Sequence, residues 1–326
     1  MAVIEISPPS GESAAPEPAM RRLGQALPFA QAIPLARRTS SFSGLLANAD
    51  IDILEHDGLL AKQLPDERVP EDDIIAFPRG AKAGSCLHAA LERVLIDAPA
   101  DRKVWPVIAA RAIDEFGLPA GCADTVVRIL DQVMNTQLNA QSALSLGAIP
   151  VDARLIEMEF WYPLEGDRSG ALERIITLHR STQGLPAVAP AAIPAVAPAA
   201  IPRVLAKGHM KGFIDLVFEH DGRYFVADYK SNWLGASIDD YASPALAANI
   251  AAECYDLQYL LYTLALDRYL AARVAGYDYE RHVGGVYYLY LRGLRRERGA
   301  ETGVYFSRPS MRVVAALRAL GPAGSS

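Results

Sequence analysis

Two runs rich in β-branched and aromatic residues flank Asp221-Gly222, in the stretch LVFEHDGRYFVADY. Asp-Gly between such runs is the strongest short-range signal for a β-hairpin with a two-residue turn. In a type I′ turn of this kind, His220 pairs with Arg223, and the partner numbers along the ladder keep a constant sum. The pattern therefore predicts a hairpin whose register is fixed by its turn.

This register places charged side chains together. Asp215 lies directly opposite Asp228, where two like charges repel unless a cation neutralises them. Lys230 follows Asp228 by two residues, so strand alternation places both side chains on one sheet face, opposite Phe213. Two carboxylates and one ammonium thus converge.

Apolar residues at three- and four-residue spacing predict helices around this hairpin. The first begins with Ser85 as its N-cap, buries Leu87, Leu91, Val94 and Leu95, and carries His88. Further helices are predicted over 104–116, 123–138, 243–272 and 310–320.

Two more strands are predicted. The first, over 155–162, has Glu157, Glu159 and Trp161 on one face and is most simply an edge strand with solvated acids. The second, over 283–291, contains Tyr287, Tyr288 and Tyr290, which serve either as packing residues or as a surface that stacks bases.

The chain divides into a flexible linker or tail over 1–38 and a domain over 39–326. The linker prediction rests on a Pro-, Ala-, Ser- and Glu-rich composition with little periodicity. Within the domain, residues 184–203 form a Pro/Ala-rich loop insertion that contains AVAPAAIP twice in tandem. Proline at this frequency blocks both helix and sheet, so the insertion is predicted to be extended or disordered.

The charge balance gives no bulk electrostatic case for nucleic-acid binding, because the 326 residues carry a net charge of -6. Any contact with DNA must be local. The arginines of LRGLRRERG either make such a contact or form a solvated turn, and they are Arg292, Arg295, Arg296 and Arg298.

The three cysteines lie far apart, without CxxC spacing. This favours a reducing cytoplasmic location, and three thiolates are too few for the four ligands of an iron–sulfur cluster. No run of about 18 apolar residues predicts a membrane span. No GxxxxGK[ST] motif is present, so an ATPase or helicase motor is not expected in this chain.

The hairpin's charged residues suit metal-assisted phosphodiester hydrolysis. Mg2+ prefers carboxylate oxygens and retains waters that it shares with substrate phosphates. A lysine beside such a site can orient or deprotonate a metal-bound water.

Several motifs resemble one family. GFIDLVF and ADYKSNWLG are similar to the nuclease domain at the C-terminal end of RecB-type subunits of RecBCD helicase-nucleases (exodeoxyribonuclease V), in the PD-(D/E)xK superfamily. Further similarity lies in SSFSGL from Ser40, GSCLH, EMEFWYP, YDLQYLLYTLALDRYL and GGVYYLYLRG. Together these motifs span residues 40–293.

The resemblance implies an α/β, restriction-endonuclease-like core with a mixed central sheet flanked by helices. It also implies a Mg2+-dependent deoxyribonuclease of DNA repair and recombination, with Ca2+ able to occupy the site without supporting cleavage. In family terms His88, Asp215, Asp228 and the backbone carbonyl of Tyr229 hold the metal, and Lys230 is catalytic.

Three supporting residues have two interpretations each. Gln258 and Tyr262 share a helix face and are either ordinary half-buried residues or, as the family's QxxxY motif, residues that position DNA or the lysine. Glu157 is either a solvated acid or a supporting or second-metal carboxylate.

The resemblance further implies RecC-like and RecD-like subunits, RecA and DNA as partners. The main alternative function is a non-catalytic interaction module that loads RecA or binds RecC and RecD. RNA cleavage by the same chemistry is a third. The sequence leaves open exonuclease or endonuclease preference, polarity, the number of metals, and whether the chain is a fragment.

Overall fold

The structure, a computed structural model, describes residues 38–40, 73–97, 101–164, 170–186 and 208–321. All of them belong to one compact unit, Arg37–Ser326. The linker predicted over 1–38 lies outside the described residues except for Arg38, which begins the first strand. Residues 41–45 of the SSFSGL motif and most of the predicted insertion also lie outside them.

Within these residues a six-stranded sheet has the order β1-β3-β4-β5-β6, and β2 pairs with β3. The β1–β3 and β4–β5 pairs are parallel, whereas the other pairs are antiparallel. The predicted mixed sheet is therefore confirmed. Its strands are β1 (Arg38–Ser40), β2 (Arg154–Leu164), β3 (Gly208–His220), β4 (Arg223–Lys230), β5 (Val283–Tyr290) and β6 (Val304–Ser307).

The hairpin formed by β3 and β4 has the predicted register. His220 pairs with Arg223, and the pairing continues in step to Leu216 and Ala227. Asp221 and Gly222 both have positive φ, at 51° and 73°, as a type I′ turn requires.

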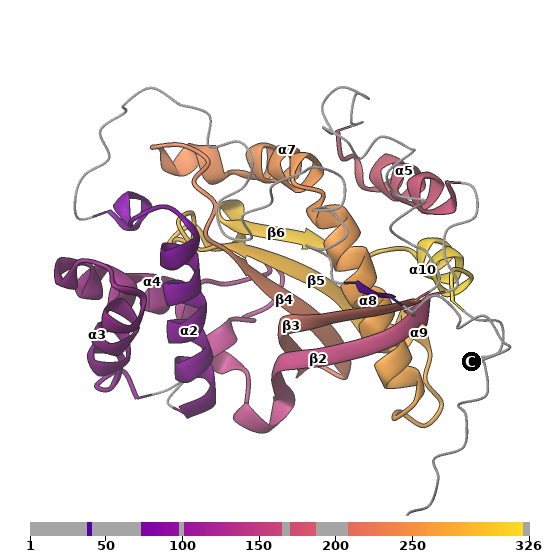
Figure 1. Cartoon of the computed structure of the whole chain (residues 1–326), viewed down its shortest axis with the longest axis horizontal. Coiled ribbons are helices and arrows are strands. Elements are labelled where there is room, and N and C mark those ends of the chain that lie inside the picture. The colour runs from indigo at the N-terminus through magenta and orange to yellow at the C-terminus, as the bar shows by residue number, and fades with distance from the viewer. Residues whose placement is uncertain (1–37, 41–72, 98–100, 165–169, 187–207, 322–326) are drawn as a thin grey trace, which may run out of the picture. The chain divides into compact units, whose positions relative to one another are not determined.

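Helices cover both faces of the sheet (Figure 1). One core joins α2, α3 and α4 to sheet residues such as Leu216 and Leu289, and the other joins α5, α7, α8 and α10 to residues such as Val217 and Tyr288. The α-helices are α2 (Ala81–Asp97), α3 (Trp105–Phe116), α4 (Ala123–Asn135), α5 (Ala171–Gln183), α7 (Ser243–Ala252), α8 (Tyr255–Ala271), α9 (Tyr279–His282) and α10 (Met311–Arg318). Short 3-10 turns are η1 (Ile74–Ala76), η2 (Ala120–Cys122), η3 (Leu146–Ala148), η4 (Val151–Ala153), η5 (Ile238–Tyr241) and η6 (Gly299–Glu301).

Three helix predictions are wrong in their boundaries. Ser85 is not an N-cap, because α2 already begins at Ala81, directly after Gly80 with φ 104°. The helix predicted over 243–272 is two helices, α7 and α8, separated at Cys254, whose left-handed φ of 54° interrupts the helical path. The helix over 123–138 ends earlier, at Asn135.

Among the described helices and strands, four were not predicted: β1, α5, α9 and β6. In α5 the buried residues Leu172, Ile175 and His179 recur at helical spacing, so the signal was present in the sequence. The short strands β1 and β6 have three and four residues, which is too few for a reliable period-2 pattern.

The edge strand β2 changes the face to which it turns its apolar side chains. Ile156 packs against the core formed with α2, whereas Met158 and Phe160 belong to the opposite core. Between them Glu157 has a φ of 50°. On β3 the partner residues show the same switch, since Leu216 and Ile214 belong to different cores. The odd-numbered residues beyond the switch, such as Trp161, are left exposed.

The tyrosines of β5 are not a surface for stacking bases, because Tyr287, Tyr288 and Tyr290 are all buried. Of their two interpretations, packing is the correct one.

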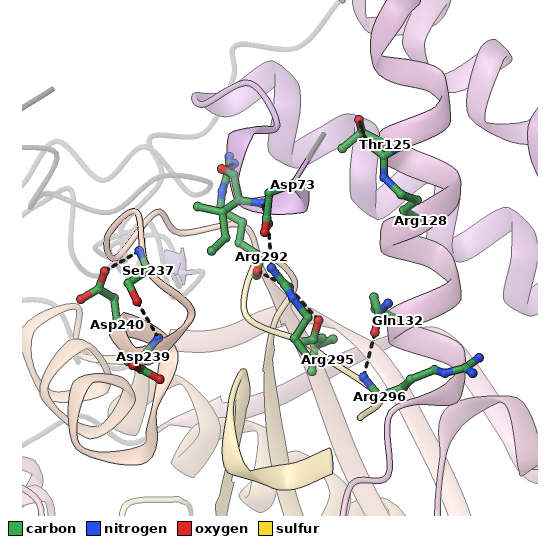
Figure 2. A network of polar contacts seen from close by, with 12 residues as sticks. Asp73, Thr125, Arg128, Gln132, Ser237, Asp239, Asp240, Arg292, Arg295 and Arg296 are labelled. Atoms are coloured by element: carbon green, nitrogen blue, oxygen red, sulfur yellow. Dashed lines mark hydrogen bonds and ion pairs between the residues drawn. The ribbon is translucent and has the colours of Figure 1, made fainter. Parts of the chain in front are cut away.

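The predicted arginine cluster does not act as one group. Arg292 is fully buried and donates hydrogen bonds to the carbonyl oxygens of Ser231, Ile75, Phe77 and Pro78. Around it, Arg295 pairs with Asp73 and the Arg296 backbone N–H bonds Gln132 of α4 (Figure 2). Arg298 pairs with Asp239. Arg292 is therefore neither a DNA contact nor a residue of a solvated turn; it ties the segment before α2 to the end of β5.

Replacing Arg292 with methionine is expected to lower the free energy of unfolding by at least about 3 kcal/mol, because several buried carbonyls lose their donor. Urea unfolding measures the loss. Arg296→Met, at an exposed side chain, is the matched control and is expected to change stability by less than about 0.5 kcal/mol. Equal stability of Arg292→Met and Arg296→Met would contradict the role of Arg292 in holding the segment before α2 against the end of β5.

None of the helices in the described ranges is both long and apolar enough to cross a membrane. Cys86 in α2 and Cys254 between α7 and α8 are buried free thiols, and Cys122 is a partly buried one.

Candidate active site

The candidate site lies where β3 and β4 stop pairing with each other. The ladder between β3 and β4 ends at Leu216 and Ala227, one step before Asp215 and Asp228. Beyond this point the amide of Tyr229 donates to the Oδ2 atom of Asp215 at 2.9 Å. The two aspartates thus lie at the open end of the hairpin, but they are not the directly opposed pair that the sequence predicted, because the ladder ends one step before them.

His88 reaches the same place from the middle of α2. Its Nδ1 atom is 3.5 Å from Oδ2 of Asp215, and its Nε2 atom is 3.0 Å from the carbonyl oxygen of Tyr229. The His88 ring also lies edge-on to the Tyr229 ring, with centroids 5.8 Å apart. Three of the residues implied as metal ligands, one of them through its backbone carbonyl, are therefore direct neighbours.

Lys230 and Asp228 form a buried ion pair. The Lys230 Nζ atom is 2.6 Å from Oδ2 of Asp228, and the side chains are 8% and 4% exposed. Nζ also donates to Oε1 of Gln258 in α8 at 3.0 Å. The Gln258 amide in turn donates to the hydroxyl of Tyr262 at 3.1 Å. Gln258 and Tyr262 therefore do share a face, and Gln258 holds the lysine directly.

Two tyrosines that the sequence analysis did not assign to the site also lie beside Lys230. Tyr288 donates its hydroxyl proton to Oε1 of Gln258 at 2.8 Å, and its ring centroid is 5.0 Å from Nζ of Lys230. The Tyr255 ring lies closer, at 4.2 Å. Aromatic faces attract an ammonium, so these rings fix its position. Tyr288 pairs with Asp228 across the parallel β4–β5 ladder.

The negative charges of Asp215 and Asp228 repel each other. Burial and the negative charge of Asp228 raise the pKa of Asp215 well above its usual range, against the opposing effects of the Tyr229 amide and Lys230. Burial also works against the charge of Lys230, but the Asp228 carboxylate outweighs it and the pKa of Lys230 is raised. One lysine therefore does not fully compensate the buried carboxylate of Asp228 and the half-buried carboxylate of Asp215.

His88 and Glu157 border this pair. Burial lowers the pKa of His88, which favours the neutral imidazole that binds metals. Partial burial, followed by the charges of Asp215 and Glu92, raises the pKa of Glu157 to about 7. Glu157 is an exposed residue whose carboxylate feels the charges of Asp215, His88 and Asp228, which places it at the edge of the site.

The donor atoms suit a hard divalent cation. Two carboxylates, a backbone carbonyl and a neutral imidazole match the oxygen-rich coordination of such ions, and a positive charge would relieve the repulsion at Asp215. Within the described residues, no group of three or more His, Cys, Asp and Glu side chains is close enough together to hold a metal ion. Asp228 is turned to Lys230 instead. The fit therefore rests on donor chemistry and on the unbalanced charge.

Comparison with known proteins gives the family. The model of the PD-(D/E)XK nuclease superfamily matches residues 63–318, which is most of the chain and includes every residue described above for the site.

Relatives carry the name RecBCD enzyme subunit RecB. The protein of Escherichia coli (strain K12) is 38% identical over 239 residues, covering 73% of this chain and 19% of the relative. That of Haemophilus influenzae is 32% identical over 249 residues, covering 76% and 19%. That of Mycolicibacterium smegmatis is 29% identical over 333 residues, covering 90% and 29%.

The chain thus spans about a fifth of the length of the first two relatives. The predicted restriction-endonuclease-like core agrees with the mixed sheet, its flanking helices and the family match. This chain belongs to the PD-(D/E)XK nuclease superfamily.

Proposed function

We propose that the chain is a Mg2+-dependent deoxyribonuclease that hydrolyses phosphodiester bonds in DNA. The observation that carries this proposal is the proximity of the buried Asp228 and the half-buried Asp215 at the open end of the hairpin, with Lys230 on one aspartate and His88 on the other. A protein that only provided a surface would gain nothing from two desolvated carboxylates that repel each other.

His88, Asp215, Asp228 and the carbonyl of Tyr229 are the residues that would hold the metal. When bound, Mg2+ supplies positive charge that stabilises the phosphate in the transition state. The Tyr229 amide orients the Asp215 carboxylate, and the Tyr229 carbonyl orients the His88 ring. One residue of β4 thus aligns two proposed ligands.

Lys230 is proposed to act on the attacking water, by orienting it or by accepting its proton. Gln258 fixes the Nζ atom of Lys230 through its Oε1 atom, and Tyr262 and Tyr288 fix Gln258. Gln258 and Tyr262 are therefore proposed as residues that position the lysine, and their effect on DNA is through Lys230. Glu157 is proposed as a supporting carboxylate at the rim.

We propose that this activity belongs to a RecB-type helicase-nuclease that acts in recombinational double-strand break repair, and similarity to RecBCD enzyme subunit RecB supports the proposal. In that setting the chain cleaves strands delivered by a helicase, leaves 5′-phosphates, and works in the cytoplasm with RecC-like and RecD-like subunits and RecA. Each of these finer statements is part of the proposal.

The second candidate function is a non-catalytic module that binds RecC-like or RecD-like subunits or loads RecA. The similarity to RecB, a subunit of the RecBCD enzyme, favours considering it. Its surface would not require the buried network of Asp228, Lys230 and Gln258.

The test is cleavage of linear single-stranded and double-stranded DNA by the purified chain in Mg2+, in Ca2+ and in EDTA. Cleavage is expected in Mg2+ and not in EDTA, and Ca2+ is expected to bind without supporting cleavage. Labelled products are expected to carry 5′-phosphates. A well-folded chain that leaves DNA intact in Mg2+ would contradict an autonomous nuclease, and binding to RecA or to a RecC-like subunit would then support the second candidate.

A further inference from the structure

Two large aromatic rings are exposed beside the candidate site. Trp161 on β2 is 66% exposed and Phe213 on β3 is 47% exposed. Between them lies Lys211, which pairs with Trp161 across the ladder, while Phe213 pairs with Glu159. We call Trp161, Lys211, Phe213 and the adjoining His209 the aromatic face. Exposed rings that gather in one place usually mark a binding surface.

The change of side-chain direction at Glu157 creates this face. Because apolar positions such as Phe160 and Ile214 turn to the core beyond that point, the odd-numbered residues turn outward. Trp161 and Phe213 are consequently exposed although tryptophan and phenylalanine are residues that strands normally bury.

The aromatic face runs into the candidate site. Phe213 precedes Asp215 by two residues, which is about 7 Å along an extended strand. On the facing strand, Glu159 follows Glu157 by the same interval. A DNA strand that extends from Asp215 along β3 therefore reaches the Phe213 ring after about 7 Å.

The rings are held in place by their neighbours. His209 packs against Trp161 with ring centroids 4.7 Å apart, and the Nζ atom of Lys211 lies 5.6 Å from the Phe213 ring centroid. Lys211 also pairs with Glu159 at 2.8 Å on the surface. Such exposed pairs contribute little to stability, so a phosphate can replace the carboxylate.

We propose that the aromatic face is a stacking platform for the unpaired bases of a DNA strand whose phosphodiester lies at the candidate site. This inference rests on the proposed nuclease function and adds to it the residues that hold the strand. Base stacking on aromatic rings tolerates any sequence. Bases of an intact duplex are already stacked on each other, so the platform selects single strands.

Charge makes stacking the main source of affinity. The chain has a net charge of -6, and the one lysine of the aromatic face is balanced by Glu159. Attraction to the phosphates is consequently small. Binding is therefore expected to depend less steeply on salt than binding that neutralises many phosphates.

The experiment measures the affinity of the full chain for a fluorescently labelled oligo(dT) by anisotropy, in EDTA so that the strand stays intact. Trp161→Ala and Phe213→Ala are each expected to weaken binding by about 5- to 100-fold. Phe306→Ala is the matched control, because Phe306 on β6 is exposed to a similar extent, 46%, away from the aromatic face. It is expected to bind as the wild type does.

A second arm separates stacking from any other effect of the substitutions. Wild type is expected to bind an abasic version of the oligonucleotide more weakly, whereas Trp161→Ala binds both versions alike. Trp161→Phe retains a ring and is expected to recover most of the affinity. Thermal melting of each variant identifies loss of fold.

The proposal is overturned if Trp161→Ala and Phe306→Ala bind oligo(dT) equally, or if wild type does not distinguish the abasic strand. The proposal is also overturned if Trp161→Ala weakens binding to a RecC-like protein and leaves binding to DNA unchanged, because the aromatic face would then be a protein interface. If the wild type binds oligo(dT) more tightly than Trp161→Ala but cleaves no DNA in Mg2+, the stacking platform is supported and the nuclease proposal is refuted. If the wild type cleaves DNA but Trp161→Ala binds oligo(dT) equally well, the nuclease proposal is supported and the platform is refuted.

Discussion

Asp215→Asn is expected to reduce the rate of DNA cleavage by at least about two orders of magnitude, the usual cost of removing a group that stabilises charge in the transition state. The same substitution is expected to leave the metal-free protein at least as stable as wild type. An asparagine oxygen can still accept the Tyr229 amide, and the repulsion between Asp215 and Asp228 disappears.

Linkage gives the sign of this stability effect. The pKa of Asp215 is raised on folding, so at neutral pH the unfolded state gains more from its ionisation, and the neutral amide removes that disadvantage. Melting curves with and without Mg2+ measure both effects. Wild type should be stabilised by the ion and Asp215→Asn should not, because only a ligand bound by the folded state raises its stability.

Asp221→Asn is the matched control for this substitution. Asp221 occupies the exposed turn of the same hairpin, where asparagine also adopts a positive φ readily. It should cleave DNA and respond to Mg2+ as wild type does. A marked loss of stability in metal-free Asp215→Asn would contradict the description of the aspartate pair as strained.

Lys230→Met is expected to reduce cleavage by at least about two orders of magnitude with the opposite effect on stability. The substitution leaves the buried carboxylate of Asp228 without its cation, and breaking a buried ion pair in this way costs about 3–5 kcal/mol. Added Mg2+ should restore part of that stability, because it provides another positive charge.

Urea unfolding and cleavage assays on Lys230→Met test these expectations together. Lys103→Met, at an exposed lysine in the segment before α3, is the control for the loss of a lysine. Wild-type cleavage by Lys230→Met would remove the lysine from the mechanism. Unchanged stability would mean that Asp228 does not depend on its partner.

The hairpin could be predicted almost completely from the sequence. The Asp221-Gly222 turn fixes the register from His220–Arg223 to Leu216–Ala227, and this brings Asp215 and Asp228 to the open end of the hairpin, although the ladder does not pair them. The position of Lys230 beside Asp228 follows from strand alternation. These are local rules, which operate within one short stretch of chain.

Long-range arrangement was less accessible. The approach of His88 and of Gln258 was inferred from family resemblance, since no local rule brings α2 and α8 to the hairpin. The contacts of Tyr288 with Gln258 depend on the parallel β4–β5 pairing, and parallel pairing is not encoded in either strand alone.

Single residues with unusual backbone conformations caused the remaining differences. Cys254 interrupts an otherwise continuous run of helix-forming residues, and Glu157 reverses the faces of β2, yet neither is a glycine. Serine is a favoured N-cap residue, but α2 begins at Ala81, shortly after Pro78 and Gly80. Ser85 therefore lies inside the helix. Arg292 is buried and donates to four carbonyl oxygens from other parts of the chain. No local sequence pattern predicts these contacts.

The candidate site combines groups that lower stability with groups that align them. The aspartate pair is unfavourable without a cation, while Tyr229, Gln258 and Tyr288 hold each charged side chain in place. Such strain is expected where function requires charges to be assembled in advance.

The measurement that tests the account most directly is Mg2+-dependent cleavage of linear DNA by wild type, Asp228→Ala and Lys230→Ala, purified in parallel and checked for folding. We expect cleavage by wild type that EDTA abolishes, and a loss of at least about 100-fold in both variants. Equal cleavage by the wild type and either variant would contradict it, because the activity would then not come from the buried charges at the opening of the hairpin.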